Sequence, residues 1–172
     1  MVDEITWRRQ MTQRHPICRL IQQRREELGL SAPEVARRSR LSTNEYFDLE
    51  QHLDEAYSVV ALYYLRKIAT LLSIEMFDLL GLKCEFCEDG SSFSEDFYLS
   101  LDELVRRRRE AKGLSPEELG DSLGYHGIEI KNIETYPAHL QSWVIDDIGE
   151  LSAQLAIPRQ VLLDSECPKC KR

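Results

Sequence analysis

Apolar residues recur along the chain at the three- and four-residue spacing of an amphipathic helix, and they do so twice in the same order. Residues 17–50 align without a gap on residues 101–134, each residue lying 84 positions from its partner. After a one-residue deletion the alignment continues at a spacing of 83. Aligned apolar pairs include Ile17 with Leu101, Leu20 with Leu104, Ile21 with Val105, Leu65 with Ile148 and Leu72 with Leu155. The chain is therefore predicted to be all-α and to contain a tandem duplication of one helical module.

Local signals divide each module into five short helices. Gly29 and Gly113 are predicted to end the first helices, because glycine adopts the left-handed conformation at a helix end without strain. Turns are predicted at 40–41 and 124–125, between the second and third helices. The second helices are predicted to begin with capping boxes, formed by Ser31 with Glu34 and by Ser115 with Glu118.

The duplication and the composition between its copies predict the domain organisation. Residues 1–16 form an N-terminal arm, residues 17–87 the first domain, residues 88–99 an acidic linker, and residues 100–172 the second domain. No apolar run approaches the roughly 18 residues that a membrane span requires. No secretory leader pattern opens the chain, so the expected location is cytoplasmic.

Each predicted domain ends in the motif C-x-x-C. The pairs are Cys84 with Cys87 and Cys167 with Cys170, while Cys18 stands alone. The two-residue spacing allows both thiolates of a pair to reach one tetrahedral metal ion. The simplest interpretation is one structural zinc site shared by all four cysteines, which would staple the ends of the two domains together. A redox dithiol or iron–sulfur role, a metal held between two chains, and free thiols are the alternatives.

Two segments carry a family resemblance, RREELGLSAPEVARRSRLSTNEYFDLE and RREAKGLSPEELGDSLGYHGIEIKNIE. Each contains a helix-1 arginine, then G-L-S, then an acidic and aliphatic helix 2, then leucine or isoleucine before glutamate. In this order they resemble the lambda-repressor-like (Cro/CI-type) helix-turn-helix family, over about 17–83 and 101–163. The resemblance implies two five-helix domains in tandem and a sequence-specific transcriptional regulator that binds double-stranded DNA. It also implies two structural ion pairs between the first and third helices, Arg25 with Glu50 and Arg109 with Glu134.

The resemblance also implies which residues contact DNA. The positions that match the base-contacting residues of the family are Thr43, Asn44 and Asp48 in the first domain, and Gly127, Ile128 and Asn132 in the second. An asparagine can bind adenine through two hydrogen bonds, and an aspartate can accept one from cytosine. In the first domain, Arg37, Arg38 and Arg40 could supply the phosphate contacts. In the second domain, Lys131 lies beside Asn132 and is a further candidate for DNA contact.

The charge of the chain argues against DNA binding. Residues 1–83 contain 12 basic and 12 acidic side chains, whereas residues 84–172 contain 10 basic and 18 acidic ones, which gives a formal net charge of −8. Asp54 and Glu55 follow the third helix of the first domain, where they would repel a phosphate. The alternative function is therefore a protein-interaction module that does not bind DNA, such as an antitoxin, an immunity protein or an adaptor.

No catalytic motif accompanies these features. The sequence lacks a glycine-rich phosphate loop, a G-x-S-x-G motif and an H-E-x-x-H motif. We therefore expect neither an enzyme nor a small-molecule substrate.

Overall fold

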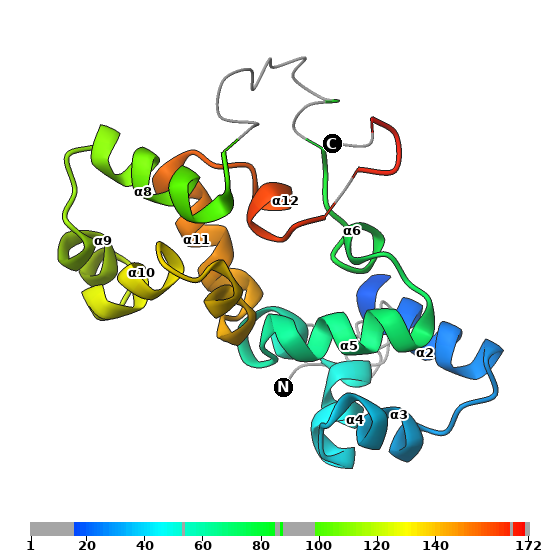
Figure 1. The fold of residues 1–172 in the computed structure, drawn as a ribbon. Coiled ribbons are helices and arrows are strands. Elements are labelled where there is room, and N and C mark those ends of the chain that lie inside the picture. Colours follow the sequence, from blue (N-terminus) through cyan, green and yellow to red (C-terminus); the bar gives the residue numbers. More distant parts are fainter. Residues whose placement is uncertain (1–15, 53, 85–86, 88–98, 166, 171–172) are drawn as a thin grey trace, which may run out of the picture. The chain divides into compact units, whose positions relative to one another are not determined.

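The protein is described by a computed structural model that covers most of the chain (Figure 1). The described residues are 16–52, 54–84, 87, 99–165 and 167–170. Nearly all of the predicted N-terminal arm and of the predicted acidic linker lies outside these residues. Within them every regular element is a helix and none is a strand, which confirms the all-α prediction. None of these helices combines the length and the apolar character needed to cross a membrane.

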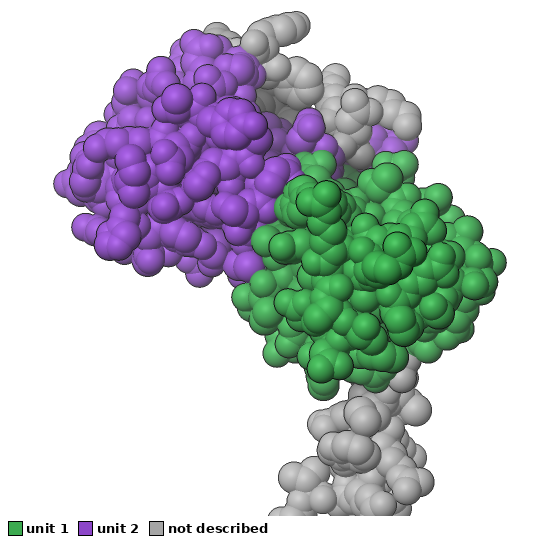
Figure 2. Space-filling model, turned by 60° about the horizontal axis from the view of Figure 1, so that its bottom comes forward, with its two compact units in different colours: residues 1–81 green, residues 82–172 purple. Residues whose placement is uncertain are grey.

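The chain divides into two compact units, residues 1–81 and residues 82–172, which Figure 2 distinguishes by colour. This division falls before Cys84 rather than after Cys87. Both C-x-x-C pairs therefore belong to the second unit.

The first unit is built from short helices whose apolar faces meet in one core. Its elements are α2 (Pro16–Glu27), α3 (Ala32–Ser39), α4 (Thr43–Gln51), the π-helical turn η1 (Glu55–Val59), α5 (Leu62–Leu72) and α6 (Met76–Leu79). Core residues contributed by α2, α3, α4 and α5 are Ile21, Val35, Leu49 and Leu65, all of them fully buried. Arg40 ends α3 in the left-handed conformation (φ 66°), so α4 begins only four residues after α3 ends.

The second unit repeats this order of elements. It contains α8 (Leu101–Ala111), α9 (Pro116–Ser122), α10 (Gly127–Ile133), the 3-10 helix η3 (Pro137–Ser142), α11 (Ile145–Leu155) and α12 (Arg159–Leu162). Helices α9 and α10 begin 84 residues after α3 and α4, whereas α11 and α12 begin 83 residues after α5 and α6. The duplication seen in the sequence is thus also a duplication of helix positions.

Ser31 and Ser115 cap the second helices of the two units, but only Ser115 forms the complete capping box that the sequence predicts for both. Ser115 forms a complete capping box: its backbone N–H donates to Glu118 Oε2 at 2.7 Å, and its Oγ accepts from the Glu118 N–H at 3.1 Å. Ser31 accepts from the backbone N–H of Glu34 at 3.3 Å. Ser42 forms a further box at the start of α4 that the sequence analysis did not identify. These bonds satisfy backbone donors that a helix leaves open at its first turn.

An ion pair fixes the third helix of each unit against the first; it is buried in the second unit and partly buried in the first. Arg25 donates to Glu50 from Nε at 2.6 Å and from Nη2 at 3.0 Å, which joins α2 to α4. Arg109 makes the same two contacts with Glu134 at 2.6 and 2.9 Å, which joins α8 to the end of α10. These hydrogen bonds to the partner glutamate raise the pKa of both arginines. Two parallel bonds constrain the orientation as well as the distance, so each pair sets the angle between its helices.

Candidate metal centre and helix-turn-helix surfaces

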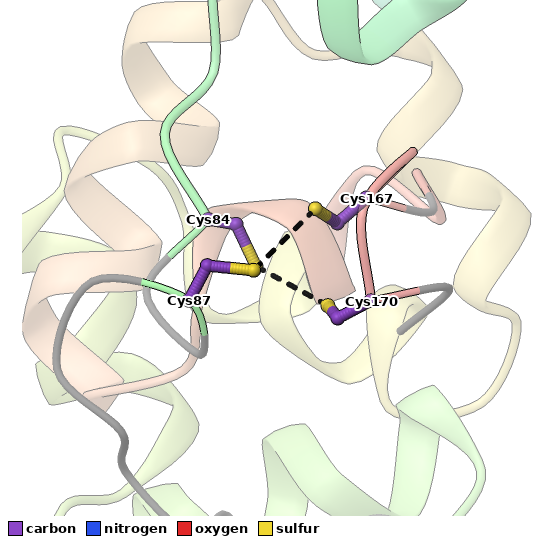
Figure 3. Close-up of side chains that lie close together, drawn as sticks. All are labelled: Cys84, Cys87, Cys167 and Cys170. Carbon is purple, nitrogen blue, oxygen red and sulfur yellow. Dashed lines mark hydrogen bonds between the residues drawn. The ribbon is translucent and has the colours of Figure 1, made fainter.

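Four cysteine side chains converge at one place in the second unit. Cys84 and Cys87 lie ahead of α8, and Cys167 and Cys170 lie in the turn that follows α12. Their Sγ atoms all lie within 4.8 Å of one another, and Figure 3 shows the side chains pointing toward a common centre. The Cys84 and Cys170 sulfurs are 3.6 Å apart, and those of Cys87 and Cys167 are 3.9 Å apart. Both separations far exceed a disulfide bond of about 2.05 Å, so these are free thiols.

The spacing of the sulfurs matches the requirements of a tetrahedral metal site. A zinc–sulfur bond of about 2.3 Å places the corners of a four-thiolate tetrahedron about 3.8 Å apart. The Cys84–Cys170 and Cys87–Cys167 separations of 3.6 and 3.9 Å lie on either side of that value, and all four sulfurs lie within 4.8 Å of one another. Thiolate ligands select soft or borderline metal ions over magnesium or calcium. The four cysteines can therefore hold a metal ion with little rearrangement.

Local backbone geometry explains how the chain presents these thiols. The N–H of Cys87 donates to the carbonyl of Cys84 at 3.0 Å, which holds the two cysteines of the first pair close together. After α12, Asp164 adopts a left-handed conformation (φ 44°), and the N–H of Ser165 donates to the carbonyl of Gln160 at 2.9 Å. Cys167, which follows this helix end, lies with its sulfur 3.9 Å from that of Cys87 in the first pair.

The site has a buried side and an accessible side. Cys84 is 6% exposed and Cys167 is 1% exposed, whereas Cys87 is exposed and Cys170 is half-buried. Burial acts to raise the pKa of Cys84, but hydrogen bonds from the Cys87 backbone, the Gln160 amide and the neighbouring thiols outweigh it and lower that pKa to about 7. Hydrogen bonds with Cys84 and Cys170 raise the pKa of Cys87 to about 12.

Gln160 is a residue of this site that sequence analysis missed. It lies in α12, is 3% exposed, and its Nε2 donates to Cys84 Sγ at 3.6 Å. At the repeat spacing of 83 its partner is Phe77, an aromatic residue in α6 of the first unit. The difference between Gln160 and Phe77 is the sequence signal that could have identified Gln160. A glutamine at a repeat position expected to be apolar needs a polar partner.

The residues predicted to bind DNA in the first unit lie together on α3 and α4 or in the turn between them. Thr43, Asn44 and Asp48 occupy α4, Arg37 and Arg38 occupy α3, and Arg40 follows α3; all six are exposed. Arg38 lies 3.9 Å from Glu34, a loose contact on the helix surface. Phe47 on α4 is also exposed.

The corresponding surface of the second unit is more engaged in contacts within that unit. Lys131 Nζ on α10 lies 2.5 Å from Glu117 Oε1 on α9, and Asn132 is half-buried. A Cβ placed on Gly127 would lie 2.8 Å from the Cα of Glu117, so α9 and α10 approach too closely for a side chain there. At the matching position the first unit has the exposed residue Thr43. The two helix pairs therefore share an order of elements but differ in their surfaces.

Comparisons of the chain with protein-family models, with curated protein sequences and with solved structures found no match. The family resemblance therefore depends on the two segments described above.

Proposed function

We propose that the chain is a sequence-specific DNA-binding transcriptional regulator with two lambda-repressor-like helix-turn-helix domains and one structural zinc site. The observation that carries the proposal is the arrangement of α3 and α4 in the first unit. They are joined by a tight turn, and the residues at the N-terminal end of α4, Thr43 and Asn44, are exposed. In helix-turn-helix proteins this end of the second helix contacts base edges in the major groove.

The first unit is assigned as the main contact with DNA. Asn44 presents an amide for adenine, and Asp48, one turn further along α4, presents a carboxylate for cytosine. Arg37, Arg38 and Arg40 supply positive charge beside them, which favours phosphate contacts. In the second unit, Lys131 is already paired with Glu117. The second unit therefore contributes orientation or a weaker second contact.

Zinc is assigned a structural role. Cys84, Cys87, Cys167 and Cys170 would supply all four ligands of a tetrahedral ion. A zinc ion with four thiolate ligands has no open coordination position, so it stabilises a fold and does not activate water. Its contribution would be to hold the two ends of the second unit together.

A protein-interaction module is the second candidate function, and charge is the observation that favours it. The second unit carries most of the acidic excess, and its Lys131 forms an ion pair with Glu117. Phosphate neutralisation supplies most non-specific affinity for DNA, so an acidic surface weakens binding. An antitoxin, an immunity protein or an adaptor would use the same scaffold to bind protein.

Selection from a random duplex pool tests the two functions against each other. The zinc-loaded chain is incubated with the pool, and the enriched sequence is titrated by fluorescence anisotropy at two salt concentrations. A regulator yields a motif, and its affinity falls steeply with salt. The absence of enrichment, together with no binding at low salt, would refute the regulator and leave the protein-interaction module.

A matched pair of variants tests the assignment to the first unit. Asn44→Ala should relax the preference at one base position, with a loss of about 1–3 kcal/mol against the correct base. Asn132→Ala, in the second unit, should leave that preference unchanged. Equal effects of the two substitutions would contradict the assignment.

A further inference from the structure

Gln160 contacts both halves of the cysteine cluster. Its side-chain Nε2 donates to Cys84 Sγ at 3.6 Å, so it reaches the first C-x-x-C pair. Its backbone carbonyl accepts from the N–H of Ser165 at 2.9 Å, within the turn that leads to Cys167. One residue of α12 therefore links the segment of Cys84 to the segment that carries the second pair. Because Gln160 is buried, water competes little for its amide.

We propose that Gln160 is a positioning residue of the metal site, whose amide N–H holds the Cys84 sulfur in place and strengthens the binding of a thiophilic divalent cation. This inference rests on the proposed metal site and deepens it. Gln160 does not ligate the ion; it acts through Cys84. The expected cation class is one that prefers four sulfur ligands in a tetrahedron, with zinc as the physiological candidate.

Charge provides the physical reason. Four thiolates around a divalent ion leave a net charge of −2, and a buried charge is costly unless hydrogen bonds compensate for it. Cys87 is exposed, so water can solvate its sulfur. Cys84 is buried, so its sulfur depends more on donors within the protein. A neutral amide supplies a donor there without adding a positive charge that would repel the cation.

The duplication provides an internal comparison. The residue matching Gln160 in the first unit is Phe77, which follows the same repeat spacing in α6. Both cysteine pairs gather in the second unit, beside α12. The amide of Gln160 is therefore present in the second unit, where the short last helix α12 contacts a cysteine sulfur. In the first unit, the aromatic side chain of Phe77 occupies the matching position of α6.

Substitutions of matched size test the role of the amide. Gln160→Met keeps the length of the side chain and removes the N–H donor. Gln160→Glu keeps the shape and places a carboxylate against the sulfur. Gln154→Met is the control, because Gln154 is exposed on α11. Zinc affinity of each full-length chain is measured by competition with a chromophoric chelator, and cobalt(II) substitution reports thiolate ligation through its charge-transfer absorption.

The proposal predicts an order of affinities. Zinc should bind the Gln160→Met chain about 10–100-fold more weakly than the unmodified chain, as is typical when a partner of a metal ligand is removed. Gln160→Glu should bind more weakly still, and Gln154→Met should match the unmodified chain. A role in packing alone predicts instead that Gln160→Met retains full affinity and an unchanged cobalt spectrum, which would overturn the proposal.

A measurement on the unmodified chain covers the case in which a variant does not fold. With NMR-active cadmium bound, one side-chain amide proton of Gln160 should show scalar coupling to the metal through the sulfur. Absence of this coupling, with the metal bound by four thiolates, would refute the contact. If the unmodified chain binds neither zinc, cobalt nor cadmium, the proposed metal site itself fails, and that outcome is distinct from failure of the role of Gln160.

Discussion

Zinc should stabilise the second unit and leave the first unit unchanged, because both cysteine pairs belong to residues 82–172. The perturbation is removal of metal with a chelator, followed by its restoration. A ligand that binds only the folded state stabilises it by RT ln(1 + [L]/Kd), which is about 4.1 kcal/mol at a free concentration 1,000 times Kd. For a unit of 91 residues, each kcal/mol shifts Tm by about 4–8 °C. The expected increase in Tm is therefore about 16–33 °C.

Differential scanning calorimetry of the full chain is the assay. Two transitions are expected without metal, and only one of them should move when zinc is added. Fluorescence assigns the moving transition, since Trp143 is buried in the second unit; Trp7, the other tryptophan, is replaced by phenylalanine for this measurement. If zinc shifted the Tm of both transitions equally, or shifted the Tm of neither, the placement of the site in the second unit would be refuted.

Single cysteine substitutions sharpen the test. Cys170→Ser removes one ligand and should abolish most of the zinc-dependent shift. Cys18→Ala is the matched control, because Cys18 is buried in α2 of the first unit. It should lower the transition of the first unit and leave the zinc-dependent shift of the second intact. Full retention of the shift in Cys170→Ser would contradict ligation by all four cysteines.

Three further predictions concern the scaffold of the second unit. Glu134→Gln should lower the free energy of unfolding by about 3–5 kcal/mol in urea titrations, because it leaves the buried guanidinium of Arg109 without its carboxylate. Gly127→Ala should cost about 1–3 kcal/mol in the same assay, since its Cβ would meet the backbone of Glu117 at 2.8 Å. Stability should also fall in acid, because hydrogen bonds with the backbone N–H and the side chain of Ser115 lower the pKa of Glu118 below 4.5. The contribution of Glu118 to stability is therefore present above pH 4.5 and is lost as pH falls through the lowered pKa. Thermal melts between pH 6 and pH 3 measure this loss.

Each of these predictions has a control within the chain. Arg109→Met combined with Glu134→Leu should recover much of the loss, because an apolar pair removes the buried charge; no recovery would contradict the explanation by an unpaired charge. Gly113→Ala tests backbone strain rather than close contact, since no atom lies within 4 Å of a Cβ there. Glu118→Gln should flatten the acid dependence, and an unchanged profile would assign that dependence to other carboxylates.

The helices were predictable because each is specified by local chemistry. The turns at Gly29 and Gly113, the cap at Ser115 and the apolar spacing all act over a few residues, and the duplication supplied each signal twice. The convergence of the four cysteines was predictable for a different reason, since equal spacing of two C-x-x-C pairs favours one shared tetrahedral site.

Other structural features depend on contacts between residues that are far apart in the sequence, and they left weaker signals in the sequence pattern. Gln160 is polar in a buried position, and its role becomes evident only when Cys84, 76 residues earlier, lies beside it. The close approach of α9 and α10 depends on two glycines: Gly120 lies against the backbone of Gly127, and Gly127 lies against the backbone of Glu117. Glycine in a sequence indicates a turn as readily as a close contact of this kind. The pairing of Lys131 with Glu117 likewise depends on the angle between two helices.

The location of the cysteines also has a topological consequence. Cys87 and Cys167 are separated by 80 positions, so a metal ion bound to both would close a ring that contains most of the second unit. By analogy with a covalent cross-link, closing a loop of this length removes unfolded-state entropy worth about 4.5 kcal/mol at 25 °C. A single cut in the backbone anywhere between these two cysteines would then open the ring without separating the pieces. The cut chain would remain one molecular species, held together by the metal, until the metal is removed.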